Sequence, residues 1–252
     1  MRRGSLWLAT IVGVGMLVGA APAAGADRQS RERVVAVDGV AKNRPDLRVE
    51  ILVRVPAGAS ARAAGDRALA AQGARRPPDV QSSGYTLNGL YWDRLPVVQN
   101  YNPSGERTAA ARTALGNTYG AWSSVPGSTY RITSGGTTSR CPSLVKGCGG
   151  GQRFDGFNDV GWSRLSGGTL GVTWYSTSVD EADMAINTRY TWSTGCRQVS
   201  GAYDLETVYL HENGHVAGLG HSSDPSAVMY PSYQTARCTL SQDDKNGLAA
   251  LY

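Results

Sequence analysis

The alternation of hydrophobic and polar residues along the chain predicts a mixture of strands and helices. Residues 47–55 alternate apolar and charged side chains in part, which is typical of a strand. Residues 59–72 are rich in alanine and end at Gly73, which favours a helix. Further strands are predicted at 91–101, 129–133, 160–162, 170–175 and 179–187, and further helices at 106–122 and 242–251. This order of elements indicates an α+β fold.

A helix is also predicted after Asp204, which stands where a residue that caps a helix N-terminus belongs. Its sequence carries His211 and His215 four residues apart, so both imidazoles lie on one face and can bind one ion. Glu212 follows His211 directly, which places its carboxylate beside a metal rather than on it.

The end of this helix is predicted to supply a third ligand. Gly218 can adopt a left-handed backbone that ends the helix and turns the chain, so His221 approaches the ion from outside the helix. Three histidines leave the fourth position of a tetrahedral zinc open for water. The alternative is a helix with scattered surface histidines. The chain has only 3 histidines, and all of them stand at these positions, which favours zinc.

The N-terminus has the pattern of a secretory signal. Residues 1–26 contain a short basic start, an apolar run too short to span a membrane comfortably, and small residues suited to cleavage. A single membrane anchor is the alternative, but the Ala, Gly and Pro after the apolar run favour cleavage. We therefore expect a secreted, extracellular protein with no stable membrane insertion after the signal is removed.

Export would place the 4 cysteines in an oxidising compartment, where an even number of cysteines indicates disulfides. Three pairings are possible. We expect Cys141 to pair with Cys148, since Pro142 can help to bend the short loop between them, and Cys196 then to pair with Cys238 across the predicted metal helix.

The net charge differs between three parts of the chain. Of the net charge of +5, residues 1–26 carry +2 and residues 27–84 carry +4 (11 basic and 7 acidic), so residues 85–252 carry −1. The C-terminal part thus has no basic surface for nucleic acid. Residues 27–84 lack cysteine and are short for an independent fold. We interpret 27–84 as a propeptide and linker, and 85–252 as the catalytic domain.

The chain resembles the matrixins, a family of metzincin zinc endopeptidases, in a secreted bacterial form. The pattern H-E-x-x-H-x-x-G-x-x-H at 211–221 carries the resemblance, as does the segment 227–231, which contains Met229 and is similar to the Met-turn of these enzymes. Pro231 and Tyr233 match the wall of a substrate pocket. Residues 240–252 match the closing helix of the catalytic domain.

The resemblance implies a fold and an activity. The fold would be a metzincin catalytic domain, with a mixed twisted sheet, an active-site helix and a C-terminal helix, preceded by a small α/β propeptide. The activity would be hydrolysis of protein or peptide substrates by a zinc-activated water, with Glu212 as general base, in an enzyme that we expect to be a monomer. Two alternatives are a zinc-retaining binding module without turnover and a zinc hydrolase of a non-peptide bond.

Latency must differ from that of vertebrate matrixins, because no cysteine precedes Cys141 and none can reach the zinc from the propeptide. The cationic segment 27–84 could lie across the slightly acidic catalytic part and block the cleft. A carboxylate such as Asp79 could also reach the open position of the metal, since oxygen ligands suit zinc. A propeptide that only assists folding is the alternative.

Calcium is a second metal that the sequence allows. Two groups of residues supply hard oxygen ligands of the kind that Ca²⁺ binds. They are Asp155, Asn158 and Asp159, and Asp180, Glu181 and Asp183. A turn and a solvated strand face explain these residues equally well.

Overall fold

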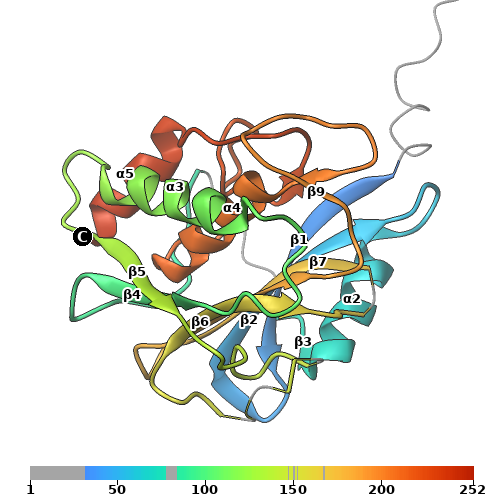
Figure 1. Cartoon of the computed structure of the whole chain (residues 1–252), viewed down its shortest axis with the longest axis horizontal. Coiled ribbons are helices and arrows are strands. Elements are labelled where there is room, and N and C mark those ends of the chain that lie inside the picture. Colours follow the sequence, from blue (N-terminus) through green and yellow to red (C-terminus); the bar gives the residue numbers. More distant parts are fainter. Residues whose placement is uncertain (1–31, 78–83, 147, 150, 152, 167) are drawn as a thin grey trace, which may run out of the picture.

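The computed structural model describes residues 32–77, 84–146, 148–149, 151, 153–166 and 168–252 (Figure 1). The expected signal peptide, residues 1–26, and Asp79 lie outside the described residues. Within the described part, none of the helices is both long and apolar enough to cross a membrane.

A mixed sheet of nine described strands runs through the molecule in the order β11-β1-β2-β7-β8-β6-β4-β5, with β3 beside β1 (Figure 1). These strands are β1 (Arg33–Ala41), β2 (Arg44–Val55), β3 (Ala74–Arg75), β4 (Val97–Tyr101), β5 (Ile132–Thr137), β6 (Asn158–Ser163), β7 (Thr169–Ser176), β8 (Ala182–Asn187) and β11 (Ser232–Tyr233). Neighbouring strands from β8 to β5 run parallel, whereas β7 is antiparallel to both β8 and β2. Strands β9 (Trp192–Ser193) and β10 (Tyr203–Asp204) form a separate parallel pair.

Helices cover both faces of the sheet (Figure 1). Helices α3 (Ala111–Ser123), α4 (Leu205–Val216) and α5 (Gln242–Leu251) lie on one face, and α2 (Ala61–Gln72) lies on the other. Each face has its own buried apolar cluster, because successive side chains of a strand point to opposite faces. This arrangement confirms the expected α+β fold, with the histidine-bearing helix α4 and a C-terminal helix.

The N-terminal strands belong to the same sheet as the rest of the chain. Strand β2 pairs with β7, and β1 pairs with β2 on one side and with β11 on the other. Odd-numbered residues of β2, among them Ile51, pack with α2 and with Val172 and Trp174 of β7. The segment 32–77 therefore shares its core with the C-terminal part, and its strands form a hairpin (β1 and β2, the N-terminal hairpin) between β7 and β11.

Several expected elements differ from the structure at their ends or in their burial. Strand β4 begins at Val97 rather than at 91, and α3 begins at Ala111 rather than at 106. All six residues of β8 are buried, so a solvated strand face is wrong for 182–187, whereas Val179 and Asp180 are exposed and precede the strand. The reason is that β8 lies between β6 and β7 in a sheet covered on both faces. Strand β1 was not predicted.

The structure contains the two expected disulfides. Cys141 is bonded to Cys148, and Cys196 is bonded to Cys238 across a sequence separation of 42 residues. The second bond joins the loop before α4 to the segment before α5, so it links the two approaches to the histidine helix.

Loss of the longer disulfide should destabilise the fold more than loss of the shorter one. In the chain-entropy account, opening the 42-residue loop costs about 4 kcal/mol and opening the 7-residue loop costs about 2 kcal/mol. Denaturant unfolding of the double variant Cys196→Ala/Cys238→Ala, with Cys141→Ala/Cys148→Ala as the matched control, measures the difference. Equal losses from the two variants would contradict this account.

Candidate metal centre

Helix α4 is an almost entirely buried helix that carries several polar side chains into the apolar core. Its N-cap is Asp204, as expected, whose carboxylate accepts from the Thr207 amide at 2.8 Å. Two tryptophan indoles donate to carbonyls of the helix, Trp122 to Leu210 and Trp92 to Val216. These bonds fix the position of the helix relative to α3 and to the segment that precedes β4.

The chain turns sharply after α4 at Gly218, which has the expected left-handed backbone with φ of +98°. A Cβ atom here would also stand 2.5 Å from the carbonyl oxygen of Leu90, so only glycine fits. The Asn88 side chain donates to the carbonyls of His215 and Leu219 and so fixes the turn. The turn brings His221 beside the helix.

The structure brings His211, His215 and His221 together, with ring centroids 4.9 to 5.4 Å apart. Each Nδ1 atom lies against an oxygen that can only accept a hydrogen bond. The acceptors are the Val228 carbonyl for His211 (2.7 Å), the Leu219 carbonyl for His215 (2.9 Å) and the Asp38 carboxylate for His221 (2.8 Å). All three protons therefore sit on Nδ1, and the Nε2 lone pairs remain available.

The Nε2 atoms of His211 and His215 face each other at 3.2 Å. With both protons on Nδ1, two lone pairs point at one another, and this contact is favourable only with a cation between them. Two nitrogens bound to tetrahedral zinc at roughly 2.0–2.1 Å are separated by about 3.3 Å, which agrees with the observed distance. The Nε2 of His221 also has no hydrogen-bond partner among the described residues. The three histidines thus fit a zinc ion.

Burial sets the protonation of this cluster. It lowers the pKa of His211 to about 3 and holds the pKa of His215 well below its usual value, so both imidazoles are neutral at pH 7. Neutral imidazole is the form that binds a metal. Burial also raises the pKa of the Glu212 carboxyl to about 7, in the range suited to an acid–base group.

Glu212 is fully buried beside the histidines. One carboxylate oxygen accepts from the Thr173 hydroxyl on β7, and the other, Oε1, has no hydrogen-bond partner in the described chain. Because the Thr173 hydroxyl orients the group, the free oxygen can take a proton from a molecule placed at the metal. Sequence reasoning did not identify Thr173, which lies in another element.

Met229 lies directly under α4. A Cβ atom on Gly214 would overlap the Met229 sulfur and would stand 2.9 Å from the Trp122 ring. The turn that holds Met229 is fixed by the buried Asp244 of α5, whose carboxylate accepts from the amides of Val228 and Met229. The C-terminal helix therefore supports the floor of the histidine site.

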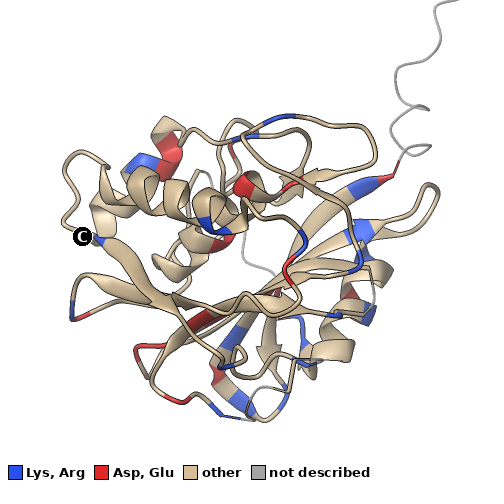
Figure 2. Ribbon diagram, viewed as in Figure 1, with Lys and Arg blue, Asp and Glu red and all other residues tan. Residues whose placement is uncertain are grey.

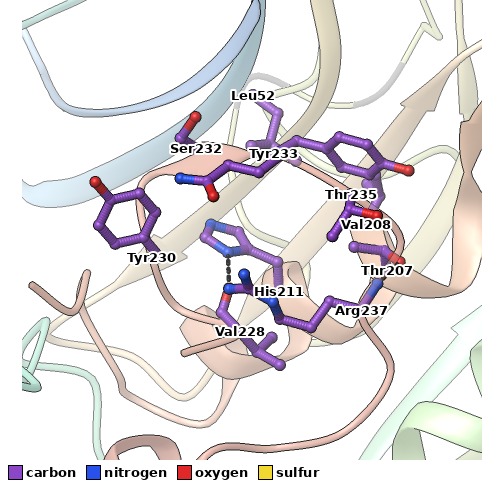
Figure 3. A pocket seen from close by; sticks show the side chains of 11 residues that line it. Leu52, Thr207, Val208, His211, Val228, Tyr230, Ser232, Tyr233, Thr235 and Arg237 are labelled. Carbon is purple, nitrogen blue, oxygen red and sulfur yellow. Dashed lines mark hydrogen bonds between the residues drawn. The ribbon is translucent and has the colours of Figure 1, made fainter. Parts of the chain in front are cut away.

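A pocket opens next to His211 (Figure 3). Tyr233 forms part of its wall, and the Tyr233 hydroxyl accepts from the Asp204 amide at 3.0 Å. Pro231 does not line this pocket; it lines a groove on the side of His221 and Asp38. Leu52 of β2 also lines the pocket.

Two carboxylates near the histidines were not predicted. Glu50 and Asp38 come from the N-terminal hairpin, where they lie directly opposite each other on β2 and β1. Oε1 of Glu50 lies 4.0 Å from Nε2 of His211 and 3.9 Å from Nε2 of His221. Among the described residues, Glu50 and the three histidines form a group that could hold a metal ion. Asp79, the carboxylate suggested from sequence, lies outside the described residues.

Protein groups pair with some of the residues considered for calcium, whereas Oδ2 of the buried Asp183 has no hydrogen-bond partner among the described residues. The Arg140 guanidinium donates to both oxygens of Asp159, at 2.8 and 2.9 Å. The Glu181 carboxylate accepts from the amides of Asp155 and Gly156. The carboxylates therefore organise the loop before β6 through protein contacts.

The three-histidine site defines a candidate zinc-binding protein, and comparison with known proteins identifies its family. A family model described as Matrixin matches residues 97–252, which is more than half of the chain. The chain belongs to the matrixin family.

Similar proteins include collagenases of mammals and a plant enzyme. The chain is 32% identical over 180 residues to an interstitial collagenase of Equus caballus, covering 69% of this chain and 35% of that protein. It is 30% identical over 182 residues to a neutrophil collagenase of Homo sapiens, covering 69% and 36%. It is 54% identical over 56 residues to metalloendoproteinase 1 of Glycine max, covering 21% and 18%. The matched part thus spans about a third of each collagenase.

Replacing Gly214 with alanine should destabilise the protein. The added methyl group has to displace the buried Met229 and Trp122 side chains, which costs roughly 1–3 kcal/mol. Gly120→Ala in α3 is the matched control, because a Cβ atom there meets no described atom within 4 Å, and this change should stabilise the helix by roughly 0.5–1 kcal/mol. Urea unfolding of both variants measures the two effects, and a neutral Gly214→Ala would contradict this packing.

Proposed function

We propose that this chain is a secreted zinc-dependent endopeptidase made as a precursor. His211, His215 and His221 hold the zinc ion, and Glu212 acts as general base. The observation that carries the proposal is the convergence of Nε2 lone pairs, two of them 3.2 Å apart, beside a buried carboxylate with one free oxygen. No feature of the described residues favours a binding module or a non-peptide hydrolase over this function.

Bound zinc would supply a Lewis acid that polarises the scissile carbonyl and makes water acidic near pH 7. The residues of the chain perform the proton transfers. Glu212 accepts a proton from the attacking water, and its protonated form then donates that proton to the leaving amine. Burial raises the pKa of this carboxyl, which favours the protonated form that the second step needs. Met229 takes no part in the chemistry and supports the helix from below.

Protein or peptide chains are the substrates in this proposal. The pocket beside His211 has apolar walls from Val208 and Tyr233, which suits one apolar side chain next to the cleaved bond. Pro231, on the far side of the same segment, borders the groove that leads to His221. Tyr233 and Pro231 would then contact a substrate on the two sides of the metal.

Export and processing complete the proposal. Residues 1–26 serve as signal peptide, 27–84 as propeptide and linker, and 85–252 as the catalytic domain, which acts outside the cell as a monomer. The two disulfides support an oxidising destination. N-terminal sequencing of the secreted protein tests the boundaries. Calcium is left out of the proposal. The Arg140 guanidinium pairs with the Asp159 carboxylate, and backbone amides donate hydrogen bonds to the Glu181 carboxylate.

Glu212→Gln should remove most peptide hydrolysis and leave the zinc content unchanged. Loss of a general base lowers kcat/KM by roughly 10²- to 10⁴-fold, whereas the three imidazoles remain in place. Casein hydrolysis, with and without a chelator, and zinc content are measured on protein of each variant that has been processed to the same N-terminus. Glu206→Gln is the matched control, since Glu206 lies in the first turn of the same helix and bonds Asn117 at the surface.

Two outcomes of that experiment would contradict the assignments. Loss of zinc together with activity in Glu212→Gln would show that Glu212 is a ligand. A processed wild-type protein that binds zinc and cleaves no peptide bond would show a binding module instead.

A further inference from the structure

The N-terminal hairpin fills the space between β7 and the pocket wall at β11. Strand β2 lies antiparallel along β7 from Leu47 to Val53, and β1 pairs with Ser232 and Tyr233. An extended peptide that adds a strand to an exposed sheet edge binds in the same way. The edge of β7 and the inner edge of β11 are therefore both occupied by the chain's own N-terminal segment.

We propose that Glu50 is the fourth ligand of the zinc ion in the intact chain. The N-terminal hairpin then fills the open coordination position of the metal without a cysteine. This inference rests on the proposed function, since it concerns the same metal. It assigns a role to a residue outside the histidine motif and gives the hairpin a chemical contact with the site.

The burial of Glu50 supports its role as a metal ligand. Its side chain is 0% exposed, and neither carboxylate oxygen has a hydrogen-bond partner among the described residues. A buried carboxylate without a partner is strongly unfavourable, whereas one bound to a cation is not. The distances of 4.0 and 3.9 Å to two Nε2 atoms exceed the roughly 3.3 Å expected between zinc ligands by about 0.6–0.7 Å. A small side-chain movement closes that gap.

The register of the sheet places Glu50 in line with two other residues that contact the site. Asp38, Glu50 and Thr173 are cross-strand partners on neighbouring strands, so their side chains share the face that carries α4. Asp38 accepts from Nδ1 of His221, Glu50 reaches the Nε2 atoms, and Thr173 donates to Glu212. One row of three residues thus contacts the third histidine, the metal position and the general base.

The pocket supplies a further argument. Leu52 lies two residues after Glu50 on the same face of β2, and its side chain lines the pocket beside His211 (Figure 3). Glu50 at the metal and Leu52 in the pocket occupy the two places that a substrate needs. The intact chain can therefore fold its site and exclude substrate from it at the same time.

The test compares zinc binding by intact chains that cannot cleave themselves. Glu212→Gln serves as the parent, and Glu50→Gln and Asp46→Asn are each added to it. Both changes remove one carboxylate from β2, but Asp46 lies near the surface and pairs with Arg44. Each protein is loaded with zinc, its mass is checked, and zinc transfer to a chromogenic chelator is timed. The melting temperature of each is measured with and without zinc.

Glu50→Gln should release zinc at least roughly tenfold faster than the parent, because even the residues that only support metal ligands contribute roughly 10- to 100-fold to affinity. The rise in melting temperature on adding zinc should also be smaller, while the metal-free protein melts at or above the parent value. Asp46→Asn should match the parent in zinc release and in the zinc-induced rise. A merely structural role for Glu50 would lower the metal-free melting temperature and leave zinc release unchanged.

Equal rates of zinc release from Glu50→Gln and the parent would overturn the role of Glu50 and leave the peptidase proposal intact. A parent that binds no zinc would overturn both. Glu50→Asp gives the same test if Glu50→Gln does not fold, because a carboxylate drawn back by one methylene should also release zinc faster than the parent.

Discussion

Two imidazole lone pairs that face each other at 3.2 Å are the constraint on which the rest of the structure depends. Each is fixed in this orientation by a hydrogen bond from Nδ1 to a backbone carbonyl, and burial keeps both rings neutral. Among the described residues, each of these two nitrogens has only the other as a hydrogen-bond partner. The helix cap at Asp204, the turn at Gly218 and the support under Gly214 all serve to hold this pair, with His221, around one cation.

The N-terminal hairpin meets this site through its carboxylates and not through its excess positive charge. Lysine and arginine residues of 32–77 are spread over β1, β2, α2, β3 and the turn between β1 and β2 (Figure 2). The charge balance of the sequence suggested attraction between a basic segment and an acidic domain. In the structure the decisive contacts are those of Asp38 and Glu50, because strand alternation points these two residues at the histidines.

The sequence predicted the local features well because each of them has a local cause. The cap at Asp204, the left-handed Gly218, the helix at 242–251 and both disulfides depend on residue types at short range or on a small set of pairings. Strand β1 was missed because its alternation is weak and its stability comes from partners at β2 and β11. Glu50 was missed for the same reason, since one carboxylate in a charged strand carries no signal until the pairing of β2 with β7 is known.

The most direct test of this account is a crystal structure of the intact, zinc-loaded Glu212→Gln chain with the metal located by its anomalous signal. We expect one zinc ion bonded to Nε2 of His211, His215 and His221 and to a carboxylate oxygen of Glu50, with Leu52 in the pocket. A zinc ion whose fourth ligand is water, with Glu50 turned away or the N-terminal hairpin displaced from β7, would contradict it.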